Sequence, residues 1–198
     1  MTAPTKIAVF ASGSGSNFQA IQEAIERGEL QATIELVVTD KPSAFVVTRA
    51  ENYSIPVLAL SPKEFSSKAD YETAIIEALQ ERHVEWIVLA GYMRLISEVL
   101  LTAYPQRIVN IHPSLLPAFP GKDAIGQAME HGVKITGVTV HFVDEGMDTG
   151  PIIAQAAVQV VEGDREATET AIHHEEHVLY TKALEQLLTS FSRSLPPL

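Results

Sequence analysis

Short apolar runs and longer amphipathic segments alternate along the first half of the chain. The apolar runs are typical of buried strands and occupy residues 6–12, 34–40, 57–60, 85–91 and 107–113. The longer segments have helical patterns and occupy residues 16–28, 43–54 and 70–83. Strands that are apolar on both faces and alternate with helices predict an α/β fold. We expect an open, twisted, mostly parallel sheet with helices on both of its faces.

The segment after the fifth apolar run differs in composition from the segments before it. Residues 112–124 contain several prolines and a glycine, which predicts an ordered loop. A helix is expected to follow over residues 125–131. A last helix is predicted over residues 165–191, and the final SLPPL is expected to form a frayed tail.

Two further apolar strands are predicted at residues 134–143 and 151–160. They flank a turn-rich segment, DEGMDTG, in the layout of a hairpin. We therefore expect an antiparallel extension of the sheet near its C-terminal end. No repeat or linker divides the sequence, so residues 1–198 are expected to form a single domain.

Charge narrows the partners that this fold could have. Asp and Glu number 25 against 14 Lys and Arg, and the formal net charge is -11 at pH 7. Such a surface repels a nucleic-acid backbone, whereas a helix N-terminus and a few backbone amides can hold one small phosphate. We expect small-molecule substrates and no nucleic-acid partner.

Composition also bears on location. The chain has no cysteine, which excludes disulfides, a thiolate nucleophile and a Cys-based zinc site. Neither a secretory leader pattern nor a run of about 18 consecutive apolar residues occurs, so no membrane association is expected. These features predict a cytoplasmic protein. They leave open whether it is a monomer or a homodimer.

The segment SGSGSN, residues 12–17, lies between the first predicted strand and the first predicted helix. Its glycines let the backbone approach a ligand, and amides at a helix start point at an anion. The segment therefore predicts binding of a phosphate or another anion. A dinucleotide fingerprint would need glycine where Phe18 stands, although Asp40 could mimic the ribose-binding acid. Dinucleotide binding and a tight turn without a ligand are the alternatives.

Asn110 and His112 lie at the carboxyl end of an internal predicted strand, where open α/β sheets bind their ligands. Because they are two residues apart, their side chains project from one face of the strand while Ile111 faces the other way. An amide donor and an imidazole before a proline-rich loop are candidates for catalysis. A structural histidine is the alternative.

Three carboxylates, those of Asp144, Glu145 and Asp148, fall within five residues of the turn-rich segment. The longer calcium-loop pattern with a distal Glu is absent, so we predict no metal site there. A solvated acidic turn is one interpretation. In the other, Asp148 meets His112 and favours its protonated form.

The remaining histidines have ordinary explanations. His173 and His177 are one helical turn apart and could chelate a metal, but the HExxH pattern is absent and their neighbours form a polar helix face. His141 is expected to be a packed, hydrogen-bonded strand residue unless the fold brings it into the site.

In this order, the segments resemble the folate-dependent phosphoribosylglycinamide formyltransferases over essentially the whole chain. The motifs that carry the resemblance are KIAVFASGSGSNFQAI, VLAGYMRLIS, RIVNIHPSLLPAFPG, VTVHFVDEGMDTGPIIAQ and EEHVLY. Each is shared more widely, and their combination is specific. The resemblance implies transfer of a formyl group from 10-formyltetrahydrofolate, without a metal, to the amine of 5-phosphoribosylglycinamide in purine biosynthesis.

The family's functional residues carry over where the motifs match. The catalytic residues would be Asn110, His112 and Asp148. The ribosyl phosphate and ribose of the acceptor would be held by Gly15, Ser16, Asn17, His173 and Glu176. The folate would be bound by Lys68, Met93, Arg94, Leu95, Ile96, Asn110, Asp144, Glu145, Gly146, Met147 and Asp148. The first half of the chain, about residues 1–105, would then be Rossmann-like and bind the phosphate. The second half, about residues 106–198, would contain the catalytic residues, the folate site and the C-terminal helix.

Two places depart from the family's pattern. Lys68 stands where some members have an arginine facing the glutamate tail of the folate, so a point charge replaces a bidentate fork. Residues 122–125 read KDAI where other members carry a His-rich stretch. The second departure alters the loop beside the site and none of the three catalytic residues.

The resemblance also implies direct transfer without an enzyme nucleophile. The amine attacks the formyl carbon, and protonated His112 and the Asn110 amide stabilise the oxyanion. Asp148 would keep His112 charged and help to move the amine's proton towards the leaving nitrogen N10 through a water.

Four other functions stay open. Formyltransferases acting on initiator methionyl-tRNA and hydrolases that release formate share the HPSLLP-type site. The first should need an RNA-binding domain and a basic surface, and the second usually has an additional N-terminal domain. A non-catalytic folate- or nucleotide-binding module has no need for all three catalytic residues, and Phe18 weakens the case for a Rossmann-type oxidoreductase.

Overall fold

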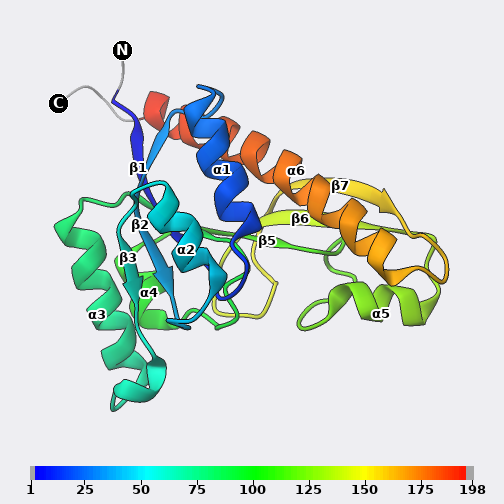
Figure 1. The fold of residues 1–198 in the computed structure, drawn as a ribbon, viewed down its shortest axis with the longest axis horizontal. Coiled ribbons are helices and arrows are strands. Elements are labelled where there is room, and N and C mark those ends of the chain that lie inside the picture. Colours follow the sequence, from blue (N-terminus) through cyan, green and yellow to red (C-terminus); the bar gives the residue numbers. More distant parts are fainter. Residues whose placement is uncertain (1–2, 195–198) are drawn as a thin grey trace.

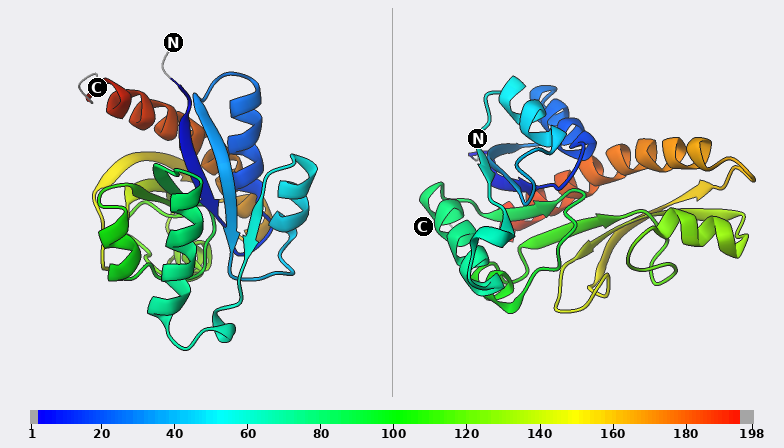
Figure 2. Two further views of the ribbon diagram at one scale, coloured as in Figure 1. Left: turned by 90° about the vertical axis from the view of Figure 1, so that its left-hand side faces the viewer. Right: turned by 60° about the horizontal axis from the view of Figure 1, so that its bottom comes forward.

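The computed structural model describes residues 3–194, which form a seven-stranded sheet with helices on both faces (Figure 1, Figure 2). The strands are β1 (Thr5–Phe10), β2 (Ala32–Thr39), β3 (Val57–Ala59), β4 (Trp86–Leu89), β5 (Ile108–His112), β6 (Ile135–Phe142) and β7 (Ile152–Gln159). The helices are α1 (Ser16–Glu26), α2 (Phe45–Asn52), α3 (Lys68–Glu81), α4 (Glu98–Ala103), α5 (Ala124–His131) and α6 (Arg165–Ser194), with a 3-10 turn η1 (Pro62–Glu64). The predicted SLPPL tail lies outside the described residues, apart from Ser194.

The strand order is β3-β2-β1-β4-β5-β6-β7. The first five strands in this order pair in parallel, whereas β5 with β6 and β6 with β7 pair antiparallel. Both the mostly parallel sheet and its antiparallel extension are therefore confirmed. Figure 1 shows the extension, in yellow and green, reaching away from the parallel part beneath α6.

Alternating side chains of the central strands fill two cores. In β1, Ile7 and Val9 pack with α1, α2 and α6, whereas Ala8 and Phe10 pack with α3 and α4 on the other face. All four side chains are fully buried, as a period of two requires for a strand covered on both faces. Burial of a side chain as large as Phe10 stabilises the fold by about 2–3 kcal/mol.

Helix α6 crosses one face of the sheet and is tied to the strands that end at the site. Tyr180 is fully buried, and its hydroxyl donates to the carbonyl oxygens of Leu89 at 2.7 Å and Val109 at 3.3 Å. These carbonyls belong to β4 and β5. The helix is thereby held directly against β4 and β5, and Glu176 lies one helical turn before Tyr180.

The sequence did not predict α4, which is short and depends on a distant partner. Glu72 in α3 is buried and accepts hydrogen bonds from the backbone N–H of Ser97, at 3.0 Å, and from its hydroxyl. Ser97 is the N-cap residue of α4 and makes no capping bond of its own, so the start of α4 is held by a side chain of another helix rather than by the local sequence.

No helix within residues 3–194 is both long enough and apolar enough to span a membrane.

Candidate active site

One cavity of about 670 Å³ opens at the carboxyl ends of β1, β4 and β5. Its walls are residues 13–17, 89–96, 110–113, 121–125 and parts of 141–148, together with His173 and Glu176 of α6. This is the position in which open α/β sheets bind ligands, because loops from several strands meet there. All the predicted site residues line this cavity except Lys68 and Glu145.

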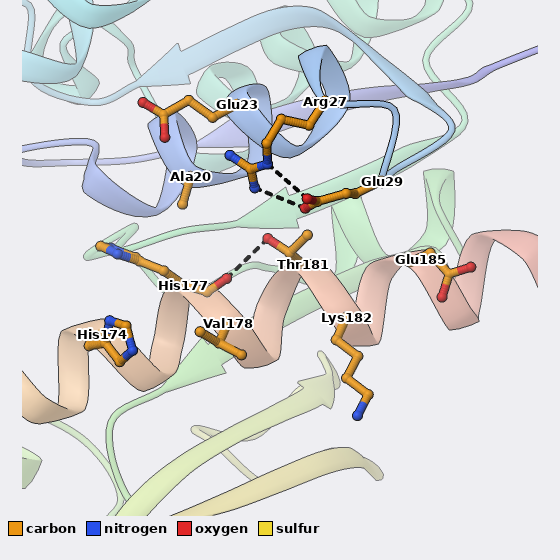
Figure 3. Close-up of a pocket in the computed structure, with 10 residues that line it drawn as sticks. All are labelled: Ala20, Glu23, Arg27, Glu29, His174, His177, Val178, Thr181, Lys182 and Glu185. Carbon is orange, nitrogen blue, oxygen red and sulfur yellow. Dashed lines mark hydrogen bonds and ion pairs between the residues drawn. The ribbon is translucent and has the colours of Figure 1, made fainter.

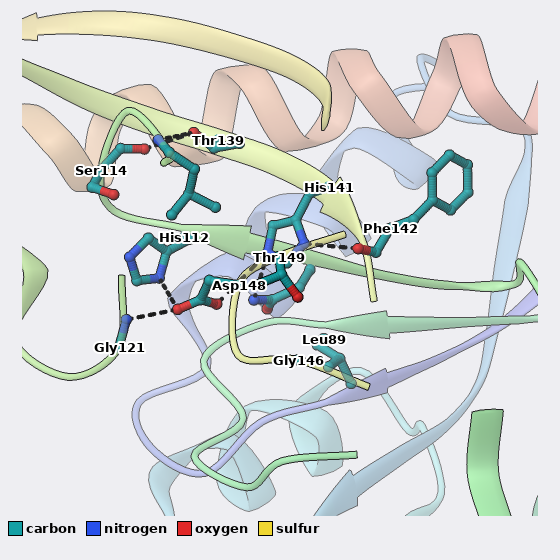
Figure 4. Close-up of polar contacts among 12 residues, drawn as sticks. Leu89, His112, Ser114, Gly121, Thr139, His141, Phe142, Gly146, Asp148 and Thr149 are labelled. Atoms are coloured by element: carbon teal, nitrogen blue, oxygen red, sulfur yellow. Dashed lines mark hydrogen bonds and ion pairs between the residues drawn. The ribbon is translucent and has the colours of Figure 1, made fainter. Parts of the chain in front are cut away.

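His112 is buried at the end of β5, and both of its ring nitrogens have partners. Its Nδ1 lies 3.4 Å from Oδ2 of Asp148 (Figure 4). Its Nε2 lies 2.9 Å from the carbonyl oxygen of Phe119, which can only accept, so Nε2 carries a proton. The carboxylate thus lies beside the ring, as in the second of the two interpretations of the acidic turn, and the Nε2 proton is engaged by the loop after β5.

Asp148 is held in a strained backbone conformation. Its φ is +56°, in the left-handed region that is unfavourable for a residue with a Cβ. The backbone N–H of Gly121 donates to the same Oδ2 that faces His112, at 2.8 Å. Two segments far apart in the sequence thus fix the carboxylate beside the imidazole. Such strain at a site costs of order 1–3 kcal/mol and persists where surrounding contacts determine the conformation.

His141 belongs to this group of side chains, although the sequence did not assign it a functional role. It stands opposite Asn110 in the antiparallel β5–β6 pair, and its Nε2 lies 3.3 Å from the Asn110 amide nitrogen. Its Nδ1 lies 2.8 Å from the carbonyl oxygen of Phe142 and therefore carries the proton. His141 Nε2 then accepts from Asn110, which fixes the orientation of that amide.

Burial lowers the pKa of His141, and the hydrogen bond to the Phe142 carbonyl and the charge of Asp148 only partly counter this effect. The ring is accordingly neutral at pH 7. The 3.8 Å separation between its Nε2 and Oδ1 of Asp148 is a proximity rather than an ion pair, because that nitrogen has no proton. Of the two histidines near Asp148, only His112 can share a proton with it.

The three carboxylates of the β6–β7 connection do not converge on a metal. Asp144 accepts from the backbone N–H of Gly146 at 3.0 Å and from the Thr149 hydroxyl at 2.6 Å, so it organises its own turn. Asp148 faces the histidines, and Glu145 is exposed outside the cavity. Within residues 3–194, no group of three or more His, Asp or Glu side chains is arranged to hold a metal ion.

The loop before α1 has the features of an anion site. Gly15 has φ +75°, and a Cβ there would lie 2.5 Å from Cγ2 of Val46, so only glycine fits. Within the described residues, no side chain caps α1. The first-turn amides of a helix have no intrahelical acceptor and carry the positive end of its dipole. The amides at the start of α1 belong to the part of the cavity wall that residues 13–17 form, so they are available to an anion.

Glu176 and Asn17 form a buried polar pair beside this loop. Burial raises the pKa of Glu176 to about 7, although a hydrogen bond with Asn17 lowers it in part. The Oδ1 atom of Asn17 is also buried and has no hydrogen-bond partner among residues 3–194. A buried acceptor without a donor costs about 1–3 kcal/mol, so this position suits a ligand with hydroxyl groups. His173 is exposed at the same edge of the cavity.

His177, one turn after His173, points elsewhere. It lines a separate open groove of about 570 Å³ between α1 and α6, together with charged residues such as Glu23 and Arg27 (Figure 3). Burial lowers the pKa of His177, and the nearby His173 and His174 lower it further. The two histidines are neighbours on α6, as their spacing requires, but His173 lines the large cavity and His177 lines this groove.

One part of the cavity wall is apolar and exposed. Met93, Leu95 and Met147 are 67%, 50% and 48% exposed, and all three line it. Large apolar side chains left open on a cavity wall are typical of a binding surface for an apolar or flat ligand. The guanidinium of Arg94 lies over the Tyr71 ring at 5.4 Å, and its buried Nε has no hydrogen-bond partner among the described residues.

Lys68 lies apart from this wall. It is the first residue of α3, exposed, and outside the cavity lining. Its predicted contact with the tail of a folate stays a prediction.

The fold and the site define an α/β protein in which one cavity combines an anion loop, an apolar wall and a His-Asp-Asn group. The chain belongs to the formyl transferase family, whose pattern it matches over residues 5–184. It is 56% identical over 184 residues to the phosphoribosylglycinamide formyltransferase of Bacillus subtilis, covering 92% of this chain and 94% of that protein.

Two further relatives place the similarity in context. The crystal structure of glycinamide ribonucleotide transformylase 1 from Geobacillus kaustophilus is 57% identical, with a TM-score of 0.91 over 93% of this chain and 99% of that one. The chain is also 42% identical, over 95% of its own length, to the trifunctional purine biosynthetic protein adenosine-3 of Drosophila pseudoobscura pseudoobscura. It spans 14% of that longer protein.

Proposed function

We propose that this protein transfers the formyl group of 10-formyltetrahydrofolate to the amine of 5-phosphoribosylglycinamide, giving 5-phosphoribosyl-N-formylglycinamide and tetrahydrofolate. One observation carries the proposal. The anion loop after β1, the apolar residues after β4 and the His-Asp-Asn group around the end of β5 line a single cavity. Two substrates bound there would meet at the catalytic residues, and orienting reactants in this way can lower a barrier by roughly 7–11 kcal/mol.

The acceptor fits the side of the cavity formed by α1 and α6. Its phosphate would accept hydrogen bonds from the backbone amides of residues 14–17, in the loop and at the start of α1, and its ribose hydroxyls would donate to Asn17 Oδ1 and to Glu176. Both side chains are buried, and Asn17 Oδ1 has no donor among residues 3–194. These features support a phosphorylated sugar with free hydroxyls, whose amine would then lie towards the end of β5.

The donor fits the apolar side. The flat ring system of a folate would lie against Met93, Leu95 and Met147, with backbone groups of residues 93–96 reading its polar edge. Two inferences from the sequence stay predictions, namely the single-domain organisation and the cytoplasmic location. The sequence did not choose between a monomer and a homodimer.

In the proposed reaction, the neutral amine attacks the formyl carbon and the carbonyl electron pair moves to oxygen. The Asn110 amide has a second hydrogen available, because its first is directed at His141 Nε2. His112 donates through Nε2, which requires the Phe119 carbonyl to release that proton first. The bond to N10 then breaks, and N10 takes up the proton lost by the amine, with Asp148 assisting through a water.

Formyl transfer should be assayed by following tetrahydrofolate release and the formylated product together, with an acceptor-free control. Acceptor-dependent release that matches the product supports the proposal. Free formate without acceptor would instead indicate a hydrolase. Absence of folate turnover would leave a binding module as the better interpretation.

The catalytic assignment predicts that His112→Ala and Asp148→Asn each lower kcat by about 100- to 1,000-fold, because a donor to the oxyanion is lost or misplaced. Acceptor binding, measured by calorimetry, should change little. His174→Ala is the matched control, since His174 is exposed on α6 outside the cavity. Near-normal turnover in both His112→Ala and Asp148→Asn contradicts the assigned roles.

A further inference from the structure

Helix α2 holds the anion loop from behind. The backbone N–H of Val46 donates to the carbonyl oxygen of Gly13 at 3.0 Å, and Nε of Arg49 donates to the carbonyl oxygen of Ser14 at 2.7 Å. Val46 also occupies the space where Gly15 has no side chain. Two successive loop carbonyls are thus directed at one helix.

These bonds determine where the loop amides point. In a trans peptide the C=O and N–H groups point in opposite directions. Because the carbonyls of Gly13 and Ser14 point towards α2, the next N–H groups, those of Ser14 and Gly15, point away from it. Ser14 and Gly15 line the cavity, whereas Arg49 does not. The amides that an anion would meet are therefore set by contacts on the far side of the loop.

The Arg49 guanidinium is itself tightly placed. Besides the Ser14 carbonyl, it donates through Nη1 to Oε1 of Gln19, one turn into α1. Gln19 is oriented for this role, because its amide nitrogen donates to Oε1 of Glu23 at 2.8 Å. The guanidinium carbon also lies over the ring of Phe45, 4.9 Å from its centroid, and this contact gives the 54% exposed phenylalanine a cationic partner.

We propose that Arg49 is a positioning residue for the phosphate of the acceptor. It fixes the Ser14–Gly15 peptide and the start of α1 relative to each other, and it adds a positive charge behind the loop. Charged hydrogen bonds of this kind are about twice as strong as neutral ones. The inference rests on the proposed function, since it assigns the loop to the phosphate, but it concerns a residue that touches neither substrate.

The test uses Arg49→Met, which keeps an unbranched apolar stem, and Arg49→Lys, which keeps the charge. Arg27→Met is the control, because Arg27 forms an exposed ion pair with Glu29 at the other end of α1 (Figure 3). Arg49→Met should raise the KM for the phosphorylated acceptor about 10- to 100-fold, as expected for the loss of a charged hydrogen bond. Both kcat and the KM for the folate should stay within about twofold, as should all constants of the control.

Two further readouts separate positioning from a general loss of structure. With the dephosphorylated acceptor, ribosylglycinamide, wild type and Arg49→Met should have the same KM, because no phosphate meets the loop. Arg49→Lys should recover only part of the loss, since one ammonium cannot reproduce the planar fork that bridges Ser14 and Gln19. An equal penalty for both acceptors, or a loss confined to kcat, overturns the inference.

Binding of ribose 5-phosphate, measured by calorimetry, tests the loop independently of catalysis. Weaker binding to Arg49→Met than to wild type supports the inference even if no formyl transfer is found, in which case only the proposed function fails. Formyl transfer by the wild type with unchanged constants in Arg49→Met sinks the inference and leaves the function standing. Failure of the wild type to bind ribose 5-phosphate also counts against the role of Arg49.

Discussion

Glu176 should make the stability of the free enzyme depend on pH. The residue is 7% exposed, and burial raises its pKa to about 7 from its ordinary value of 4.5, against a smaller lowering by Asn17. Between these two values the unfolded chain has released the proton that the native protein still holds. Stability therefore falls as pH rises through this window, because the native state binds more protons than the unfolded state.

The size of the effect follows from the difference between the two pKa values. At about 1.4 kcal/mol for each tenfold change in proton affinity, the loss approaches about 3 kcal/mol well above pH 7. Between pH 5.5 and pH 8.5 it amounts to about 2 kcal/mol, because part of the loss has occurred by pH 5.5. For a chain of this size that corresponds to about 4–8 °C in Tm.

Glu176→Gln removes the titrating group and nearly preserves the shape of the side chain. Its free energy of unfolding should be measured by urea titration without substrate and compared with that of the wild type at each pH. We expect the difference, variant minus wild type, to increase by about 2 kcal/mol between pH 5.5 and pH 8.5. Glu185→Gln, an exposed position on the same helix, is the control and should follow the wild type. The KM for the acceptor should rise in Glu176→Gln, because an amide accepts hydroxyl protons less strongly than a carboxylate. Parallel pH profiles for Glu176→Gln and wild type would refute the reasoning.

Two other substitutions test the geometry of the site. Gly15→Ala should raise the KM for the acceptor at least about tenfold, because its Cβ would lie 2.5 Å from Cγ2 of Val46 in a left-handed backbone. Gly28→Ala is the control, because Gly28 has a similarly unfavourable φ of +74° but no atom within 4 Å of its Cβ position. It should cost stability and leave the KM for the acceptor unchanged. Equal KM values in the two variants would argue against acceptor binding at the loop. His141→Phe should slow single-turnover formyl transfer about two- to tenfold, because Asn110 loses the acceptor that orients its amide. An unchanged rate in this variant would mean that Asn110 needs no such partner.

The sequence by itself determined the order and type of the main elements. Short runs that are apolar on both faces and alternate with helical patterns are typical of buried strands in a covered sheet, and the turn-rich spacer between two such runs favoured the antiparallel end that β6 and β7 form. It also located the loop around Gly15 and the strand end with Asn110 and His112. These are local properties, since glycine freedom, strand alternation and strand ends depend on a few neighbouring residues.

Contacts between distant segments were decided only by the tertiary structure. The register of β5 against β6 places His141 beside Asn110, and a one-residue slip would turn it to the other face. The loop that follows β5 brings the Phe119 carbonyl to His112, and the folding of α2 onto α1 places Arg49 behind Ser14. Spacing along the chain carries no signal for such contacts, because each depends on how separately formed elements pack against one another.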